Sequence, residues 1–212
     1  TAIAGIGTAL TKGWGRLDAL DQAKAKLEAL GNSGATVEQV MDNALASVKG
    51  TAFGIGEAAG TAAVLVGAGV KPGQELERTL KLVADSAAIA GISFEEMGSI
   101  WGKVASNTVL SGEEMAQISD RSIGLQVALA EKFGVTAQEA KKMVSEGKVS
   151  FEDFSDAMEG LVGGGAVRMG DTVSGALDNL GAAFGRAGAQ VLESGFEAAP
   201  GILADLTTAV DG

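Results

Sequence analysis

The sequence predicts an all-α protein. A compact bundle of short capped helices is expected, with an apolar, small-residue helix before it and an extended helical arm, rich in glycine and alanine, after it. Two observations predict this fold class. The 212 residues include only two prolines, Pro72 and Pro200, so long tracts are free to form helices. Apolar residues recur at spacings of three and four, and no segment alternates with the period of two typical of a half-buried strand.

Residues 1–49 are predicted to form two amphipathic helices. From Trp14 onward, apolar residues recur with a helical period as far as Leu30, and Gly31 follows where a helix commonly ends in the left-handed conformation. A second helix is expected to begin at Thr36, whose hydroxyl would cap the first turn while Gln39 reaches back to the backbone. This part of the chain therefore precedes the bundle as a helical pair.

Residues 50–71 are predicted to form one apolar helix. Between Lys49 and Lys71 the only charged residue is Glu57. Residues 50–70 would span about 32 Å as a helix, close to the roughly 30 Å hydrocarbon core of a bilayer. The uncharged part, residues 58–70, would span only about 20 Å. Packing against protein is therefore favoured, and insertion into a membrane in another state is the alternative.

Small residues recur four positions apart in this segment and again in the arm. Such spacing places small side chains on one helix face and lets two helices approach closely. The candidate membrane or helix-packing residues are Gly50, Gly54, Gly56, Gly60, Val64, Leu65 and Val66. The candidate packing residues of the arm are Gly181, Gly185 and Ala189. Because the chain has 32 glycines, such pairs also arise by chance, and self-association stays an open alternative.

Residues 72–162 are predicted to form the compact bundle. Its helices share a start signal, in which an apolar residue precedes Ser or Thr and an acidic residue stands three positions later. The hydroxyl and the carboxylate can satisfy the free N–H groups of the first turn. The predicted capping residues are Ser93, Ser111, Thr136 and Ser150. The predicted helix ends are Gly91, Gly134 and Gly147.

The apolar faces of these helices predict the core of the bundle. Its methionines and aromatic residues are interpreted as packing, because no polar group converges on them as a cofactor would require. The predicted core residues are Leu76, Leu80, Val83, Ala87, Met97, Ile100, Trp101, Val104, Met115, Ile118, Val127, Phe133, Met143, Val144, Phe151, Phe154, Met158 and Leu161.

Composition excludes much catalytic chemistry. The chain has no His and no Cys, so it has no Ser-His-Asp triad, no thiol nucleophile and no ordinary zinc site. The paired carboxylates, such as Glu113 and Glu114, stand in first helical turns, where capping and the helix dipole explain them. We therefore expect no enzyme, no cofactor and no metal. The net charge of −11 argues against specific binding of nucleic acid.

Residues 163–212 are predicted to be a glycine-rich joint followed by the arm. Gly163–Gly165 lacks the Lys and Ser or Thr of a phosphate-binding loop, so a flexible joint is the interpretation. The chain begins at Thr1 and ends at Gly212 without a recognisable terminal signature, and we expect it to be a fragment of a longer protein.

The order of motifs from Met41 to about Val191 resembles a domain near the N-terminal part of the tail tape measure proteins of tailed bacteriophages. No single motif is diagnostic, but their order is. The similar stretches include Lys49–Gly54, Ile100–Val104, Leu110–Ile118, Leu129–Val135, Val144–Phe151 and Thr172–Leu180. The family often has proline at the position of Leu125, which leaves the shape of one turn open.

The resemblance implies a structural virion protein that lies in the lumen of the tail tube. It would set tail length during assembly and leave at infection to assist DNA passage through the host envelope. The implied partners are other copies of itself as a homo-oligomer, the tail tube protein, tail tip or baseplate proteins, tail assembly chaperones, and the host membrane on ejection. The chain would be in the host cytoplasm during assembly. A membrane-active helical effector and a helical adaptor are the alternatives.

Overall fold

The structure is a computed structural model that describes the backbone of residues 2–170 and the side chains of residues 15–170. This part of the chain is built from ten α-helices, and its only strand-like feature is a single isolated β-bridge. The helices are α1 (Ala2–Ala29), α2 (Gly34–Val48), α3 (Ile55–Gly67), α4 (Gln74–Ala90), α5 (Phe94–Asn107), α6 (Gly112–Ser119), α7 (Leu125–Phe133), α8 (Ala137–Ser145), α9 (Phe151–Val162) and α10 (Gly165–Gly170). The predicted all-α, multi-helix fold is confirmed.

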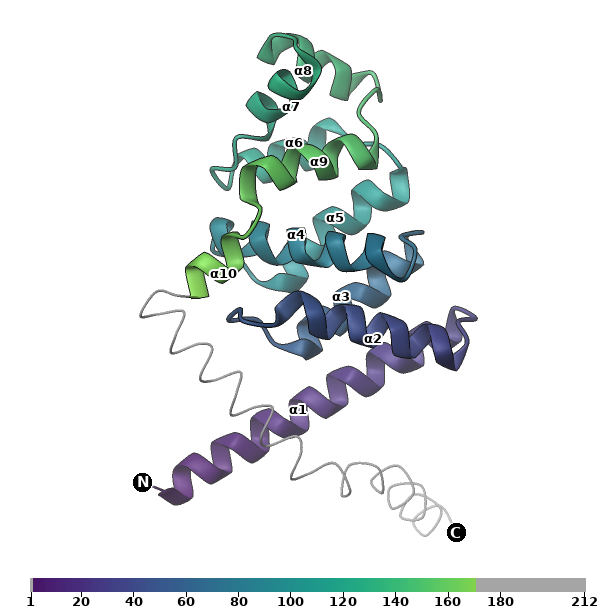
Figure 1. The fold of residues 1–212 in the computed structure, drawn as a ribbon, viewed down its shortest axis with the longest axis vertical. Helices are drawn as coiled ribbons and strands as arrows, with labels where there is room; N and C mark the ends of the chain where they lie inside the picture. Colours follow the sequence, from purple (N-terminus) through teal and green to yellow (C-terminus); the bar gives the residue numbers. More distant parts are fainter. Residues whose placement is uncertain (1, 171–212) are drawn as a thin grey trace.

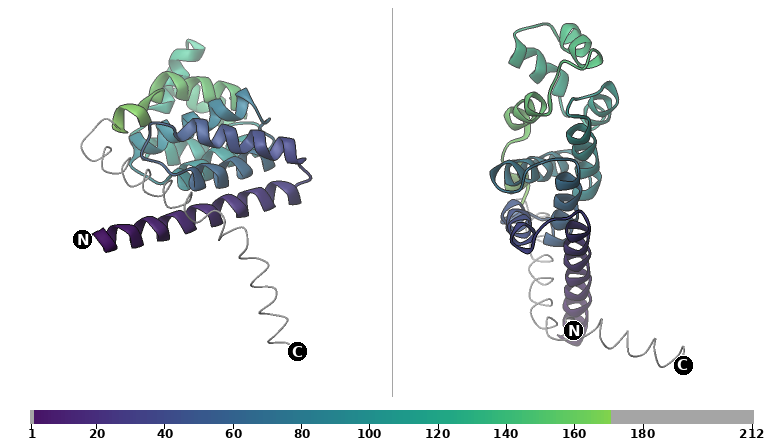
Figure 2. Two further views of the ribbon diagram at one scale, coloured as in Figure 1. Left: turned by 60° about the horizontal axis from the view of Figure 1, so that its bottom comes forward. Right: turned by 90° about the vertical axis from the view of Figure 1, so that its right-hand side faces the viewer.

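The helices stack in two layers along the long axis of the molecule (Figure 1). One layer runs from α1 through α3 and α5 to α6, and the other runs from α2 through α4 to α9 (Figure 2). The short helices α7 and α8 cover the end of the stack, where α7 packs against α9. At the opposite end, α1 crosses the stack, whereas α10 packs against α4, the middle helix of its layer.

One continuous core cluster runs between the two layers. Trp101, Phe94 and Phe154 are among its largest fully buried side chains, and the Trp101 ring lies 4.5 Å from that of Phe154. Most of the predicted core is buried, and Phe133, Met143 and Phe151 are partly buried at its edge.

The prediction of a buried side chain is wrong for two residues, Val127 and Leu161. Val127 is 56% exposed, because α7 at the end of the stack turns Leu125, Leu129 and Ala130 inward, and Val127 lies on the opposite face. Leu161 is 37% exposed for a similar reason, since its neighbours Met158 and Val162 take the inner face of α9. The apolar periodicity predicts these two helices correctly, but it does not show which face of each helix is covered by another helix.

The predicted helix starts of the bundle are confirmed. The hydroxyls of Ser93, Ser111, Thr136 and Ser150 each accept a hydrogen bond from a backbone N–H of the first turn. Gly91, Gly134 and Gly147 adopt the left-handed conformation at helix ends, as does Gly31 after α1. The predicted cap at Thr36 is wrong, because Ser33 has the extended backbone of a capping residue and its Oγ accepts from the Thr36 N–H at 3.4 Å.

The apolar helix is shorter than predicted, because α3 begins at Ile55 rather than at residue 50. The chain first makes a turn in which Thr51 Oγ1 donates to the carbonyl of Val48 and accepts from the Phe53 N–H. The helix then starts where the Glu57 carboxylate accepts from the Gly54 N–H at 2.9 Å. The single acid of this segment therefore marks its first turn.

A β-bridge pins together the two ends of the segment that carries α6, α7 and α8. The Leu110 N–H donates to the carbonyl of Val149 at 2.9 Å, and the Phe151 N–H donates to that of Thr108 at 3.0 Å. The segment that carries α6, α7 and α8 therefore begins and ends at one point of the fold. The bridge brings α9 back onto α4, a helix that precedes it by about 70 residues in sequence.

Candidate helix-packing and ion-pair sites

The apolar helix α3 lies between α1 and α5, and at each contact a glycine lets the two helix backbones come close together. A Cβ at Gly56 would lie 2.9 Å from the Cβ of Ala19 in α1. On the α5 side, a Cβ at Gly98 would lie 2.8 Å from Oγ1 of Thr61 in α3. A Cβ at Gly102 would lie 3.0 Å from Cγ1 of Val64. Glycine on either side of α3 thus allows three helix backbones to pack closely in one layer.

The structure separates the candidate residues of this segment. Gly50, with a φ of +79°, and Gly54, which caps α3, both lie in the turn before the helix and share no helix face. Within α3, Gly56 contacts α1, whereas a Cβ at Gly60 would meet no atom within 4 Å.

The three apolar candidates also differ. Leu65 is fully buried, Val66 is partly buried and Val64 is exposed at the edge of the layer. Gly181, Gly185 and Ala189 lie outside the described residues. Of the helices within residues 2–170, none combines the length and the apolar character that a membrane span requires.

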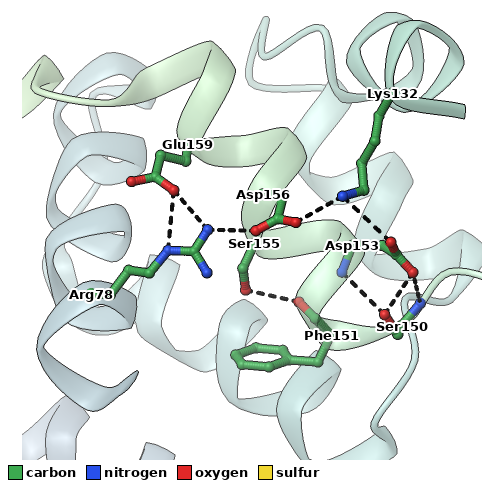
Figure 3. Close-up of polar contacts among 8 residues, drawn as sticks. All are labelled: Arg78, Lys132, Ser150, Phe151, Asp153, Ser155, Asp156 and Glu159. Carbon is green, nitrogen blue, oxygen red and sulfur yellow. Dashed lines mark hydrogen bonds and ion pairs between the residues drawn. The ribbon is translucent and has the colours of Figure 1, made fainter. Parts of the chain in front are cut away.

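Helix α9 carries three carboxylates that pair with cations from two other helices (Figure 3). Nη2 of Arg78 in α4 donates to Asp156 and to Glu159, at 2.6 Å each. Nζ of Lys132 in α7 lies 2.7 Å from the other oxygen of Asp156 and 3.5 Å from Asp153. Asp156 is therefore shared between α4 and α7, and the network joins three successive helices of the stack.

The pKa values of these groups are shifted in the directions that pairing requires. The hydrogen bond from Lys132, followed by that from Arg78, lowers the pKa of Asp156. The hydrogen bond to Asp156 raises the pKa of both Lys132 and Arg78. The pKa of Asp153 is lowered chiefly by the hydroxyl of Ser150, the residue that caps α9.

Sequence reasoning missed this network. A signal was present, since the three acids recur every third residue and so share one face of α9. Their partners, however, stand 21 residues away or more in sequence, and only the fold brings them together.

Two adjoining hollows lie between α4 and α9 beside this network. One has a volume of about 390 Å³, with Phe151, Thr79 and Ser155 among its lining residues. The other has a volume of about 620 Å³ and reaches Lys81, Asp85 and Gly164. The hydroxyls of Thr79 and Ser155 donate to backbone carbonyls of their own helices. Among the described residues, no group of His, Cys, Asp or Glu has the arrangement to hold a metal ion.

The glycine-rich joint is a fixed turn where the sequence predicts a flexible one. The two carboxylate oxygens of Asp85 in α4 accept from the N–H groups of Gly164 and Ala166, at 2.8 Å each. Asp85 is only 7% exposed. Long-range hydrogen bonds to a buried carboxylate are invisible in the local sequence, where three consecutive glycines indicate freedom.

Comparison with known families gives one finding. The model of the tape measure protein family matches residues 12–193, which covers most of the chain from within α1 to beyond α10. Searches of curated proteins and of solved structures find no significant match.

Proposed function

We propose a structural role inside the phage tail for this chain, which belongs to the tape measure protein family. The observation that carries the proposal is the family match over residues 12–193. The family resemblance implies that the chain lies in the lumen of the tail tube and is in the host cytoplasm during assembly. The inside of a tube is a confined space, and a narrow stack of short helices with few aromatic residues suits it.

We propose further that the chain contributes to tail length through its extended parts. A helix rises about 1.5 Å per residue, so α1 with its 28 residues spans about 42 Å. Residues 30–170 instead fold back on one another in the stack and add little length per residue. The length that a ruler needs would therefore come from α1 and from the predicted arm after Gly170.

Tail length tests the ruler role directly. In a phage whose gene lacks only residues 171–212, tails measured by electron microscopy should shorten by about 63 Å, the helical length of 42 residues. This deletion keeps α10 and its contacts with Asp85. A matched phage carrying the same 42 residues in scrambled order, with helical spacing kept, should have normal tails. Intact tails of unchanged length after the deletion would overturn the ruler role of the arm.

The partners of the chain follow as proposals from its place in the tail. They are further copies of itself, the tail tube protein, tail tip or baseplate proteins and assembly chaperones. The net charge of −11 supports protein partners rather than specific nucleic acid.

We propose the segment 50–70 for the membrane step of DNA passage. Its apolar composition and single acid support this step, although α3 would first have to leave its place between α1 and α5. A peptide of residues 50–70 should then insert into liposomes at some pH. Failure at every pH tested would count against this step but not against the ruler role.

A helical adaptor is the second candidate function, and the folded stack favours it. Its end is covered by α7 and α8, and hollows open between α4 and α9. An adaptor would leave tail length unchanged when residues 171–212 are deleted, so the same experiment separates the two functions.

A further inference from the structure

We propose that Asp85 is a releasable anchor for α10, and that Lys81 becomes the partner of Asp85 when α10 leaves. This inference concerns a movement within the chain, and it holds whether or not the chain measures tail length.

The Asp85 carboxylate holds the start of α10 directly. Its two oxygens accept from the Gly164 and Ala166 N–H groups, and hydrogen bonds to an ionised acceptor are stronger than neutral ones. Helix α10 has six residues, too few for a helix to be stable in isolation. Its buried residues are small, namely Gly165, Ala166 and Gly170. The contact with α4 therefore holds this helix in place, and the buried residues that α10 brings to it are small.

The junction between α9 and α10 consists of three glycines, and each stands where a side chain would be strained or would clash. A Cβ at Gly163 would lie 2.7 Å from the carbonyl oxygen of Glu159, and Gly164 has a φ of +75°. A Cβ at Gly165 would lie 2.8 Å from Cδ1 of Ile89 and 3.2 Å from the backbone oxygen of Asp85. A side chain is thus disfavoured at each of the three positions for a different reason. A flexible linker would not require glycine at any particular position, so the three glycines indicate a fixed turn.

Lys81 stands one helical turn from two acids on α4 and now pairs with one of them. Its Nζ lies 2.5 Å from Glu77, four residues before it, while Asp85 is four residues after it. Lys81 and Asp85 line the same hollow between α4 and α9. A lysine pairs better with an acid four residues before it than four residues after it. The pair with Glu77 is therefore the expected one as long as α10 occupies Asp85.

Release of α10 changes this balance, because Asp85 would lose both of its donors. A buried carboxylate without hydrogen-bond partners is costly, and Lys81 is a cation within reach along the same helix. Arg168, whose Nη1 lies near Gly164, belongs to α10 and would move away with it. The two arrangements are thus α10 on Asp85 with Lys81 on Glu77, and α10 free with Lys81 on Asp85. The second frees the chain from residue 163 onward while α1–α9 keep their packing.

Amide hydrogen exchange followed by NMR on the full chain tests the anchor. In Asp85→Asn, the Gly164 and Ala166 amides should exchange at least tenfold faster, because a charged acceptor is lost. The amides of α1–α9 should keep their rates. Gly165→Ala retains Asp85 but blocks the fit of the turn, so it should also speed exchange at these two amides. This second variant tests the anchor even if Asp85→Asn folds poorly.

Two further variants test the role of Lys81, because they should change the amide exchange rates in opposite directions. Glu77→Gln sets Lys81 free to pair with Asp85, so exchange at Gly164 and Ala166 should be about twofold faster. Lys81→Gln removes the alternative partner, so exchange there should be about twofold slower. Lys103→Gln is the matched control, since Lys103 is 50% exposed, pairs with Glu113 at 3.6 Å and lies on α5; it should change neither amide.

Three results would overturn the proposal. Unchanged exchange at Gly164 and Ala166 in both Asp85→Asn and Gly165→Ala would show that the carboxylate does not anchor α10. Faster exchange throughout α1–α9 in both variants would show that α10 cannot leave without unfolding the stack. Shifts of the same sign, or none, in Glu77→Gln and Lys81→Gln would show that Lys81 is no alternative partner.

Discussion

Asp156 is the residue on which the ion pairs of the stack converge. Its two oxygens contact Arg78 of α4 and Lys132 of α7, so its loss affects contacts between three helices. The side chain is 40% exposed, and solvent screening keeps each pair weak. We expect Asp156→Asn to lower the free energy of unfolding by about 1 kcal/mol at pH 7, as measured by urea denaturation. Glu38→Gln, on an exposed position of α2, should change it by less than about 0.5 kcal/mol.

The same variant carries a pH dependence whose sign follows from the lowered pKa of Asp156. A carboxyl with a lower pKa in the folded state stabilises the protein above its unfolded pKa of about 3.9, and this stabilisation is lost as pH falls through the folded pKa. The difference between wild type and Asp156→Asn should therefore be full at pH 7 and shrink below about pH 4. A difference that stays constant down to pH 2 would mean that packing, rather than charge, causes the loss.

Caps and helix ends are the features of each element that the sequence predicts best. The pairs Ser93 and Glu96, or Ser150 and Asp153, are three residues apart, so the contact is formed by the helix itself and needs no partner element. The start of α3 is set by local contacts of Thr51 and Glu57, but the exposure of Val127 depends on which helix lies against which, and periodicity does not show that. The ion pairs and the contact of Asp85 with Gly164 were missed for the same reason, because their residues are far apart in sequence.

A pair of glycine substitutions tests how α3 packs against its neighbours. Gly98→Ala places a Cβ 2.8 Å from Oγ1 of Thr61, whose branched side chain has little freedom to move, and should lower the free energy of unfolding by about 1–3 kcal/mol. Gly60→Ala meets no atom within 4 Å and should raise it by about 0.5–1 kcal/mol through better helix propensity. Thermal or urea unfolding checks both values. Equal effects of the two variants would contradict the close approach of α3 and α5.

At the scale of the whole molecule, the layered stack has no separate cores. The cluster of buried residues is continuous from Ala23 of α1 to Ala166 of α10, and it includes the apolar helix and the helices after it. The division at residues 49, 71 and 162 was inferred from changes in composition along the chain, and it stays a prediction about sequence segments. Composition changes along the chain wherever one helix is more apolar or richer in glycine than the next. A folding unit, in contrast, is defined by helices that bury their side chains in the same core.

This shared burial predicts cooperative unfolding of residues 15–170. Because every helix from α1 to α9 contributes to one core, loss of any layer would expose the apolar face of the next, and we expect a single transition. Trp101 is fully buried near the middle of the stack, so its fluorescence reports the core, and a Trp14→Phe background removes the only other tryptophan. Urea midpoints from Trp101 fluorescence and from helical circular dichroism should then coincide. Two separated midpoints would show that the segments fold independently, and the stack would then be an assembly of units rather than one body.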